Sequence, residues 1–249
     1  LQTLAGHRGP ITSLDFSEPY GALVSSSGEE ASPLVWDLSS GTQVGRLRGH
    51  TAGVRALQVE EELCITGSQD ATVRLWDLRR VEDWETRLEM KNGEEEEQEP
   101  HVRLAASADA AAKDKEEWNP MLRKLEGHTK AVTSLYFDEG CLITGASDKT
   151  LRQWDLNTGQ CVLTMDILWA ASGAEAALHS WEMYTDFVGA VQFWGYALAS
   201  ASGDGAVRMW DMRTGQAHRT LLGHTAPVTC LQFDETHVVS GSLDKSIRV

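Results

Sequence analysis

Residues 127–155 read GHTKAVTSLYFDEGCLITGASDKTLRQWD, and this stretch decides the fold. It opens on a Gly-His pair and closes on a Trp-Asp pair, with 26 residues from His128 to Trp154. The same distance along the chain joins His50 to Trp76. A pair of motifs that recurs at a fixed offset, in units of about 40 residues, indicates an array of structurally equivalent units.

Further copies of the unit follow from counting. HTKAVTSLYF at 128–137 matches HTAPVTCLQF at 224–233 position by position, and YTDFVGAVQF at 184–193 keeps the pattern with Tyr in place of His. The units therefore begin near His7, His50, His128, Tyr184 and His224. Gly-His and Trp-Asp at this spacing are typical of WD repeats, so the sequence predicts an all-β WD40 β-propeller with about five blades.

Each unit is expected to form one four-stranded blade. In the third unit the strands are predicted at 132–137 (innermost), 142–146, 150–154 and 161–165 (outer). In the last unit, the position of Asp244 predicts a Trp just after Val249. Because WD propellers most often have seven blades, whose closure removes exposed sheet edges, we expect five blades of seven with the last one truncated.

Two insertions interrupt the repeat. Residues 81–120 contain the acidic run EEEEQE and lack apolar periodicity, so we expect a disordered insertion that folding does not require. The outer strand of that blade is placed after the insertion, at 122–125. Residues 166–183 form a second insertion, which is predicted to lie between two blades on the side of the Gly-His turns.

Composition narrows the classes of partner. The net charge of −15 and pI near 4.9 argue against binding to nucleic acid, which needs clustered Lys and Arg. They also argue against adsorption to anionic lipid. No apolar run approaches the roughly 20 residues of a spanning helix, so no direct membrane insertion is expected. The four cysteines fall in predicted strands without metal-like spacing, and we expect reduced thiols.

His128, Ser134, Asp148 and Trp154 form the most conspicuous polar constellation in the chain. Out of context they resemble a catalytic site. Their types and spacing are instead those of a buried hydrogen-bond tetrad, in which Asp orients His, His contacts Ser, and Ser contacts the indole N–H. The pattern recurs in other units, and a catalytic site would not be copied around a ring. We therefore expect a structural role, no enzyme activity, no cofactor and no metal.

Four residues are candidates for binding a partner. Arg55 lies on an innermost strand, and Arg74 lies two residues before a Trp. A structural role or a general contact with an acidic partner is the alternative for both arginines. Trp169 and Trp181 lie in the second insertion and would form either a small core of their own or an interface anchor, where aromatic residues are enriched.

The segment from Gly127 to Val249 resembles the fungal WD-repeat mitochondrial division proteins. MDILWA at 165–170 and SWEMYTDF at 180–187 carry the resemblance, because generic WD repeats would not explain them. The resemblance implies an adaptor that recruits a dynamin-related GTPase to the mitochondrial outer membrane through a small fission receptor. It assigns the GTPase to the propeller, and the receptor and self-association to an N-terminal region outside these residues.

The sequence thus predicts a non-enzymatic interaction scaffold that resembles a mitochondrial fission adaptor. It would be cytoplasmic and peripheral on the cytosolic face of the mitochondrial outer membrane, with rigid blades presenting loops to an assembling GTPase. The alternative is the substrate-recognition propeller of an F-box-type ubiquitin ligase, since some of these line a phosphopeptide pocket with arginines. Thr133 and Thr229 occupy the positions that correspond to Arg55, so no ring of arginines is expected.

Overall fold

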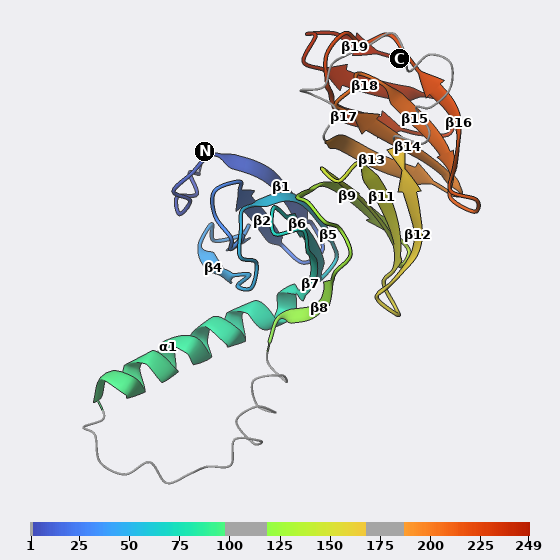
Figure 1. The fold of residues 1–249 in the computed structure, drawn as a ribbon. Helices are drawn as coiled ribbons and strands as arrows, with labels where there is room; N and C mark the ends of the chain where they lie inside the picture. The colour runs from blue at the N-terminus through green and yellow to red at the C-terminus, as the bar shows by residue number, and fades with distance from the viewer. Residues whose placement is uncertain (1, 98–118, 168–186) are drawn as a thin grey trace.

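The computed structural model describes residues 2–97, 119–167 and 187–249. These residues form five antiparallel sheets that follow one another along the chain, with the long helix α1 projecting away from them (Figure 1). In each sheet the strands pair in sequence order, so each sheet is a meander made from one repeat unit. This arrangement confirms the prediction of an all-β propeller with five blades.

The blades have short strands of two to seven residues. The first blade comprises β1 (Ile11–Ser17), β2 (Ala22–Ser27), β3 (Leu34–Asp37) and β4 (Gln43–Arg46). The second comprises β5 (Val54–Glu60), β6 (Leu63–Ser68), β7 (Val73–Asp77) and β8 (Met121–Leu125). The third comprises β9 (Val132–Asp138), β10 (Cys141–Ala146), β11 (Thr150–Asp155) and β12 (Gln160–Asp166). The fourth comprises β13 (Val188–Trp194), β14 (Ala197–Ser202), β15 (Val207–Asp211) and β16 (Gln216–Leu221). The fifth comprises β17 (Val228–Phe233), β18 (Val238–Ser242) and β19 (Ile247–Arg248).

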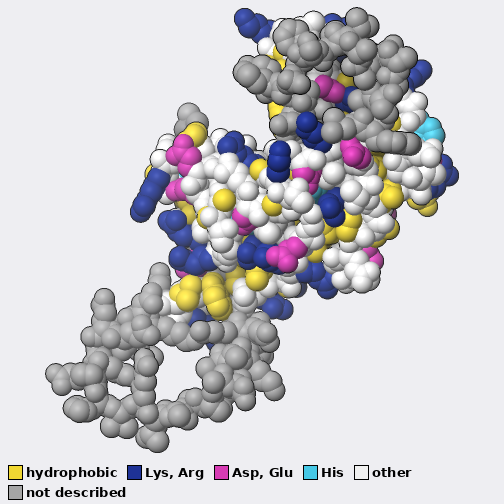
Figure 2. All heavy atoms as spheres, viewed as in Figure 1, with side chains coloured by type: hydrophobic (Ala, Val, Ile, Leu, Met, Phe, Trp, Pro, Cys, Tyr) yellow, Lys and Arg dark blue, Asp and Glu magenta, His cyan; other side chains and the backbone are white. Residues whose placement is uncertain are grey.

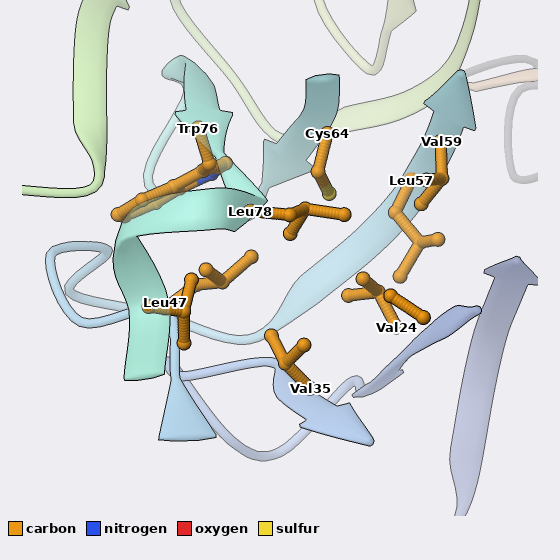
Figure 3. Packing of buried hydrophobic residues seen from close by; sticks show 10 residues of the cluster. Val24, Val35, Leu47, Leu57, Val59, Cys64, Trp76 and Leu78 are labelled. Atoms are coloured by element: carbon orange, nitrogen blue, oxygen red, sulfur yellow. The ribbon is translucent and has the colours of Figure 1, made fainter. Parts of the chain in front are cut away.

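The hydrophobic core lies between blades. One cluster joins the first and second blades, where Val24 and Val35 from one sheet face Leu57 and Trp76 from the next (Figure 3). Separate clusters join the second blade to the third, the third to the fourth, and the fourth to the fifth. Because the second, third and fourth sheets pack against a neighbour on both faces and the first and fifth on one, a blade depends on its neighbours for most of its apolar burial.

Hydrogen bonds also link the innermost strands of neighbouring blades. The Gln58 side chain donates to the Phe137 carbonyl at 3.0 Å and accepts from the Phe137 amide at 2.9 Å. Asp15 accepts from the Val59 amide at 2.8 Å, and Gln192 accepts from the Phe233 amide at 2.8 Å. Asp15, Gln58 and Gln192 occupy equivalent positions of their units, so this contact repeats with the blades.

The expectation of disorder across 81–120 is wrong for its first part. The short helix η1 (Leu78–Arg80) runs into α1 (Val81–Glu97), and Leu78 and Val81 are buried in the core between the first two blades. Glu85 accepts a hydrogen bond from the Arg46 amide at 2.9 Å and pairs with Arg48 at 3.0 Å. The first turns of α1 are therefore part of the packed structure, which contradicts the expectation that this segment is dispensable.

The other expectations for the insertions fall partly within and partly outside the described residues. The outer strand β8 lies where the spacing places it, just before the Gly-His pair of the third unit. Residues 98–118 and 168–186 lie outside the described residues, and with them most of the insertion expected at 166–183. Ile167, at the start of that insertion, is buried in the core between the third and fourth blades.

Candidate functional site: the Gly-His face and the channel opening

The tetrad of the third blade forms, with one change of membership. His128 Nδ1 lies 2.9 Å from Asp148, and His128 Nε2 lies 2.7 Å from the hydroxyl of Thr144. The same hydroxyl accepts the indole N–H of Trp154 at 2.8 Å. The prediction that Ser134 supplies this hydroxyl is wrong, because Ser134 Oγ is buried and has no hydrogen-bond partner among the described residues.

Strand pairing explains the change. In β10, Thr144 lies opposite Arg152, two residues before Trp154, and side chains two residues apart point to the same face of a sheet. Ser134 lies opposite Gly145, the next residue, and so points to the other face. Every described unit carries a hydroxyl residue at the Thr144 position; the set is Ser25, Thr66, Thr144, Ser200 and Ser240. That regularity is the signal in the sequence that identifies the correct residue.

The second blade shows the electrostatics of the tetrad. Burial lowers the pKa of His50 and so favours the neutral imidazole. The hydrogen bond and negative charge of Asp70 act in the opposite direction but do not outweigh burial. Burial alone would raise the pKa of Asp70, but hydrogen bonds from Thr72, the Thr51 amide and His50 outweigh it and hold that pKa well below its usual range. The carboxylate thus stays charged while it fixes the turn that follows the Gly-His pair.

The first and fifth blades repeat this network. His7 pairs with Glu30 and with Ser25, which accepts the Trp36 indole N–H at 2.8 Å. Glu therefore takes the place of Asp in the first blade. In the fifth blade His224 lies 2.8 Å from Asp244 and 3.0 Å from the Ser240 hydroxyl.

In the fourth blade the carboxylate of the turn has a different partner. Its unit has Tyr184 at the His position, which lies outside the described residues. Here Asp204 accepts two hydrogen bonds from the guanidinium of Arg208, at 3.2 and 2.5 Å. The Trp210 indole still donates to the Ser200 hydroxyl at 2.8 Å. A buried arginine thus partners the turn carboxylate that His partners elsewhere.

Arg74 belongs to the structural framework. Its side chain is 8% exposed, and its Nη1 lies 2.8 Å from Met121 Sδ. In the third blade the equivalent Arg152 lies with its guanidinium 6.0 Å from the centroid of the Trp154 ring. These arginines cover the tetrads, so the expectation that Arg74 contacts a partner is wrong: the side chain is not accessible. The alternative reading, a structural role, holds for this position.

Arg55 has a different environment, which a repeated irregularity of the backbone creates. In all five blades the pairing between the first and second strands shifts by one residue near the Gly-His end. Such a bulge leaves one residue unpaired and turns its side chain away from the ladder. The unpaired residues are Thr12, Arg55, Thr133, Gly189 and Thr229. All five line one cavity of about 560 Å³, which we call the channel opening.

Two of the hydroxyls at the channel opening also join blades. Thr12 donates to the Val54 carbonyl at 3.0 Å, and Thr133 donates to the Val188 carbonyl at 2.8 Å. At Gly189 the next blade approaches so closely that an added Cβ would lie 2.1 Å from the Val228 carbonyl oxygen. Thr12, Thr133 and Gly189 are therefore held against the neighbouring blades.

Arg55 supplies the positive charge among the residues that line the channel opening. Its side chain is exposed, and the Gln69 amide oxygen, oriented to satisfy both groups, accepts from its Nη2 and Nε at 2.6 Å each. No carboxylate within the described ranges forms an ion pair with Arg55. Three threonines, Ser147 and Phe187 are among the other residues that line the opening. This arrangement suits a carboxylate, phosphate or carbonyl oxygen presented by a partner.

The other candidates and classes of site can be placed briefly. Trp169 and Trp181 lie outside the described residues. Among the residues that the structure describes, no three His, Cys, Asp or Glu side chains gather as a metal site requires. No helix in the described ranges is long and apolar enough to cross a membrane. Positive and negative side chains are interspersed over the visible face of the blades (Figure 2), unlike the continuous basic surface of a nucleic-acid-binding protein.

Repeats, tetrads and bulges together define a class of protein, the WD-repeat propellers. The chain belongs to the WD domain, G-beta repeat family, which matches at residues 1–37, 41–77, 119–155 and 215–249. The fourth unit, which begins near Tyr184 and lacks the His, is matched only at its end, by the match at residues 215–249. This weak match fits the replacement of the His–Asp pair by Asp204 and Arg208 in that unit.

Relatives narrow the class further. The chain is 51% identical over 95% of its length to a protein of Mycosarcoma maydis named Mitochondrial division protein 1, and 53% identical over 92% to that of Malassezia globosa. The protein of the same name from Aspergillus clavatus is 43% identical over 96%. These matches confirm the resemblance to the fungal mitochondrial division proteins. The chain spans 37–39% of the length of these relatives.

A solved structure supports the fold independently. The crystal structure of the computationally designed Ika8 protein superposes with a TM-score of 0.66 at 25% sequence identity. The match covers 97% of this chain and 58% of that chain.

Proposed function

We propose that this chain is a non-enzymatic scaffold in mitochondrial division, which holds a dynamin-related GTPase on the cytosolic face of the mitochondrial outer membrane. The similarity to proteins named for mitochondrial division supports the process. The repeated structural tetrads support a role in binding, because the polar groups that resemble a catalytic site are buried and engaged with one another. The membrane itself would be reached through other proteins.

The contact with the GTPase is assigned to the Gly-His face. The channel opening carries the proposal, because it presents an exposed guanidinium, free of any ion pair with the described carboxylates, within a rigid frame of hydroxyls. A preorganised site loses little conformational entropy on binding. Trp169 and Trp181 are proposed as further apolar anchors on the Gly-His face, since in the sequence they lie between an outer strand and the next Gly-His position.

A pull-down with a purified dynamin-related GTPase tests the proposal. Arg55→Glu should reduce the captured GTPase by about tenfold or more, since it replaces an attraction by a repulsion at the centre of the contact. Arg219→Glu is the matched control, because Arg219 is exposed on the outer strand β16 and carries the same change of charge. Equal binding by Arg55→Glu and the unsubstituted protein would refute the role of the channel opening.

The anchors need their own variants. Trp169→Ala and Trp181→Ala should weaken capture while the melting temperature stays unchanged. Loss of binding together with loss of folding would assign these residues to a small core instead. Unchanged binding would exclude their loop from the contact.

The rival function is recognition of a phosphorylated substrate by a ubiquitin-ligase propeller, and the same Arg55 cation favours it. The kind of ligand that binds the channel opening distinguishes the two functions. A phosphopeptide that binds the channel opening, and loses affinity when dephosphorylated, would support the rival. Capture of the GTPase without dependence on phosphate supports the scaffold.

A further inference from the structure

The face opposite the Gly-His turns carries a second concentration of unusual residues. It is formed by the turns between the first and second strands of each blade, which hydrogen bond to the turns between the third and fourth strands. Leu78 N donates to the Glu62 carbonyl, Leu156 N to the Gly140 carbonyl, and Met212 N to the Tyr196 carbonyl, at 2.9 Å each. These bonds place both kinds of turn on one face.

Acidic residues occupy the turns of the second and third blades. Glu60, Glu61, Asp138 and Glu139 are exposed, and no ion pair within the described ranges neutralises any of them. They lie close together, because the Gln58 side chain, two residues before Glu60, hydrogen bonds to the backbone of Phe137, the residue before Asp138. Partial burial and the neighbouring Asp138, Glu61 and Glu139 carboxylates accordingly raise the pKa of Glu60. Like charges held this close repel one another, and a cation placed among them would relieve the repulsion.

The next turn is aromatic. Between β13 and β14 the fourth blade carries Trp194 and Tyr196, which are 56% and 67% exposed. The Tyr136 and Phe193 rings pack edge to face with centroids 5.2 Å apart, and this contact joins the third and fourth blades beside these turns. Large exposed aromatic side chains in a single turn are typical of protein interfaces rather than of solvated hairpins.

One of these rings already binds a cation within the chain. The guanidinium of Arg213 lies 5.3 Å from the centroid of the Tyr196 ring, and Asp211 holds it at 2.6 Å. A ring, a guanidinium and a carboxylate thus form one unit at this turn. The exposed Trp194 ring, whose indole makes the strongest cation–π contacts of the aromatic residues, is available for a second unit of the same kind.

We propose that Glu60, Glu61, Asp138, Glu139, Trp194 and Tyr196 form a docking surface, here called the hairpin-tip surface, for a Lys- or Arg-rich segment of a protein partner. The carboxylates would pair with the basic side chains, and Trp194 would stack on one of them. The net charge of −15 disfavours a second copy of this chain as the occupant, and the acidic surface repels nucleic acid. The surface lies opposite the channel opening, so both can be occupied at once.

Fluorescence anisotropy with a labelled peptide of alternating lysine and serine tests the proposal, at about 0.15 M salt. The same peptide with acetylated lysines is the control for charge. In the full chain, Glu61→Gln with Glu139→Gln should weaken binding of the lysine peptide by about fivefold to tenfold. Trp194→Ala should weaken it by about threefold, because an exposed cation–π contact is lost.

A charge-matched pair separates local docking from general attraction to an acidic protein. Glu29→Gln with Glu126→Gln removes the same charge from exposed positions near the Gly-His turns and should change the affinity by less than about twofold. Equal losses from both pairs would overturn the proposal. So would undiminished binding by Trp194→Ala, or equal binding of the acetylated peptide. Unchanged melting temperatures show that the variants remain folded.

Discussion

Replacing Thr144 with valine keeps the shape of a buried side chain and removes the hydroxyl that joins Trp154 to His128. The two contacts measure 2.8 and 2.7 Å, and Thr144 is fully buried. The substitution leaves the indole N–H and His128 Nε2 without partners where water does not reach. Since each buried polar group without a partner costs about 1–3 kcal/mol, the loss of both should lower the free energy of unfolding by about 2–6 kcal/mol.

Ser134→Ala is the internal control. Its hydroxyl is buried in the same blade but has no partner among the described residues, so its removal abolishes no hydrogen bond. We expect the free energy of unfolding to change by less than about 0.5 kcal/mol, or to rise, because an unpaired buried polar group is removed.

Urea unfolding followed by circular dichroism distinguishes the two variants. Thr144→Val should lower the midpoint with an unchanged slope, which indicates a loss of stability rather than a change in the unfolding transition. The reasoning would be refuted if Ser134→Ala destabilised the protein as much as Thr144→Val, because Ser134 would then be the residue that links His and Trp.

Three further outcomes follow from the contacts. Val81→Ala should lower the free energy of unfolding, measured in urea, by about 1–3 kcal/mol, because the Val81 side chain is fully buried. Glu82 is exposed in the same turn of α1, so Glu82→Ala should change that free energy little. Equal effects of the two substitutions would show that α1 is not packed. Gln58→Leu should cost about 1–3 kcal/mol by leaving the Phe137 amide without its partner in the next blade, and a neutral result would contradict this link. The pKa of Asp70 is lower in the folded state than the usual 3.8, so its stabilising contribution is present above about pH 4 and is lost as the pH falls towards the lowered pKa. Asp70→Asn should therefore flatten the acid limb of the stability profile, and an unaltered limb would rule this carboxylate out.

The arrangement of blades could be predicted from the sequence because it rests on spacing. Gly-His and Trp-Asp mark the start and end of three strands in the first three units, so they locate β8 correctly even after a long insertion. The Tyr184 unit follows from the residue pattern at 184–193, which matches the other units although Tyr replaces His. Periodic apolar residues then supply the cores between blades.

The choice between Ser134 and Thr144 needed information that spacing lacks. Both are hydroxyl residues in the same blade, and the register between β9 and β10 decides which one faces the Trp. A one-residue difference in register reverses the face of a side chain. Comparison of the five units at the Thr144 position would have resolved it, since each carries Ser or Thr there.

The insertion and the channel opening escaped prediction for different reasons. The first turns of α1 make tertiary contacts through Val81 and Glu85, and two such contacts leave no periodic signal in a charged segment. The bulges that aim Arg55 and its counterparts at the opening have no single residue type in common, so the backbone geometry had to be seen.

Hydrogen–deuterium exchange with and without a purified dynamin-related GTPase tests the central claim most directly, because the two faces of the blades are read in one experiment. The account predicts slower exchange around Arg55, Ala131 and Thr229, which line the channel opening, and little change at the turns around Glu61 and Tyr196. Unchanged exchange throughout the chain, or slowing confined to the hairpin-tip surface, would contradict the assignment of the GTPase contact to the Gly-His face.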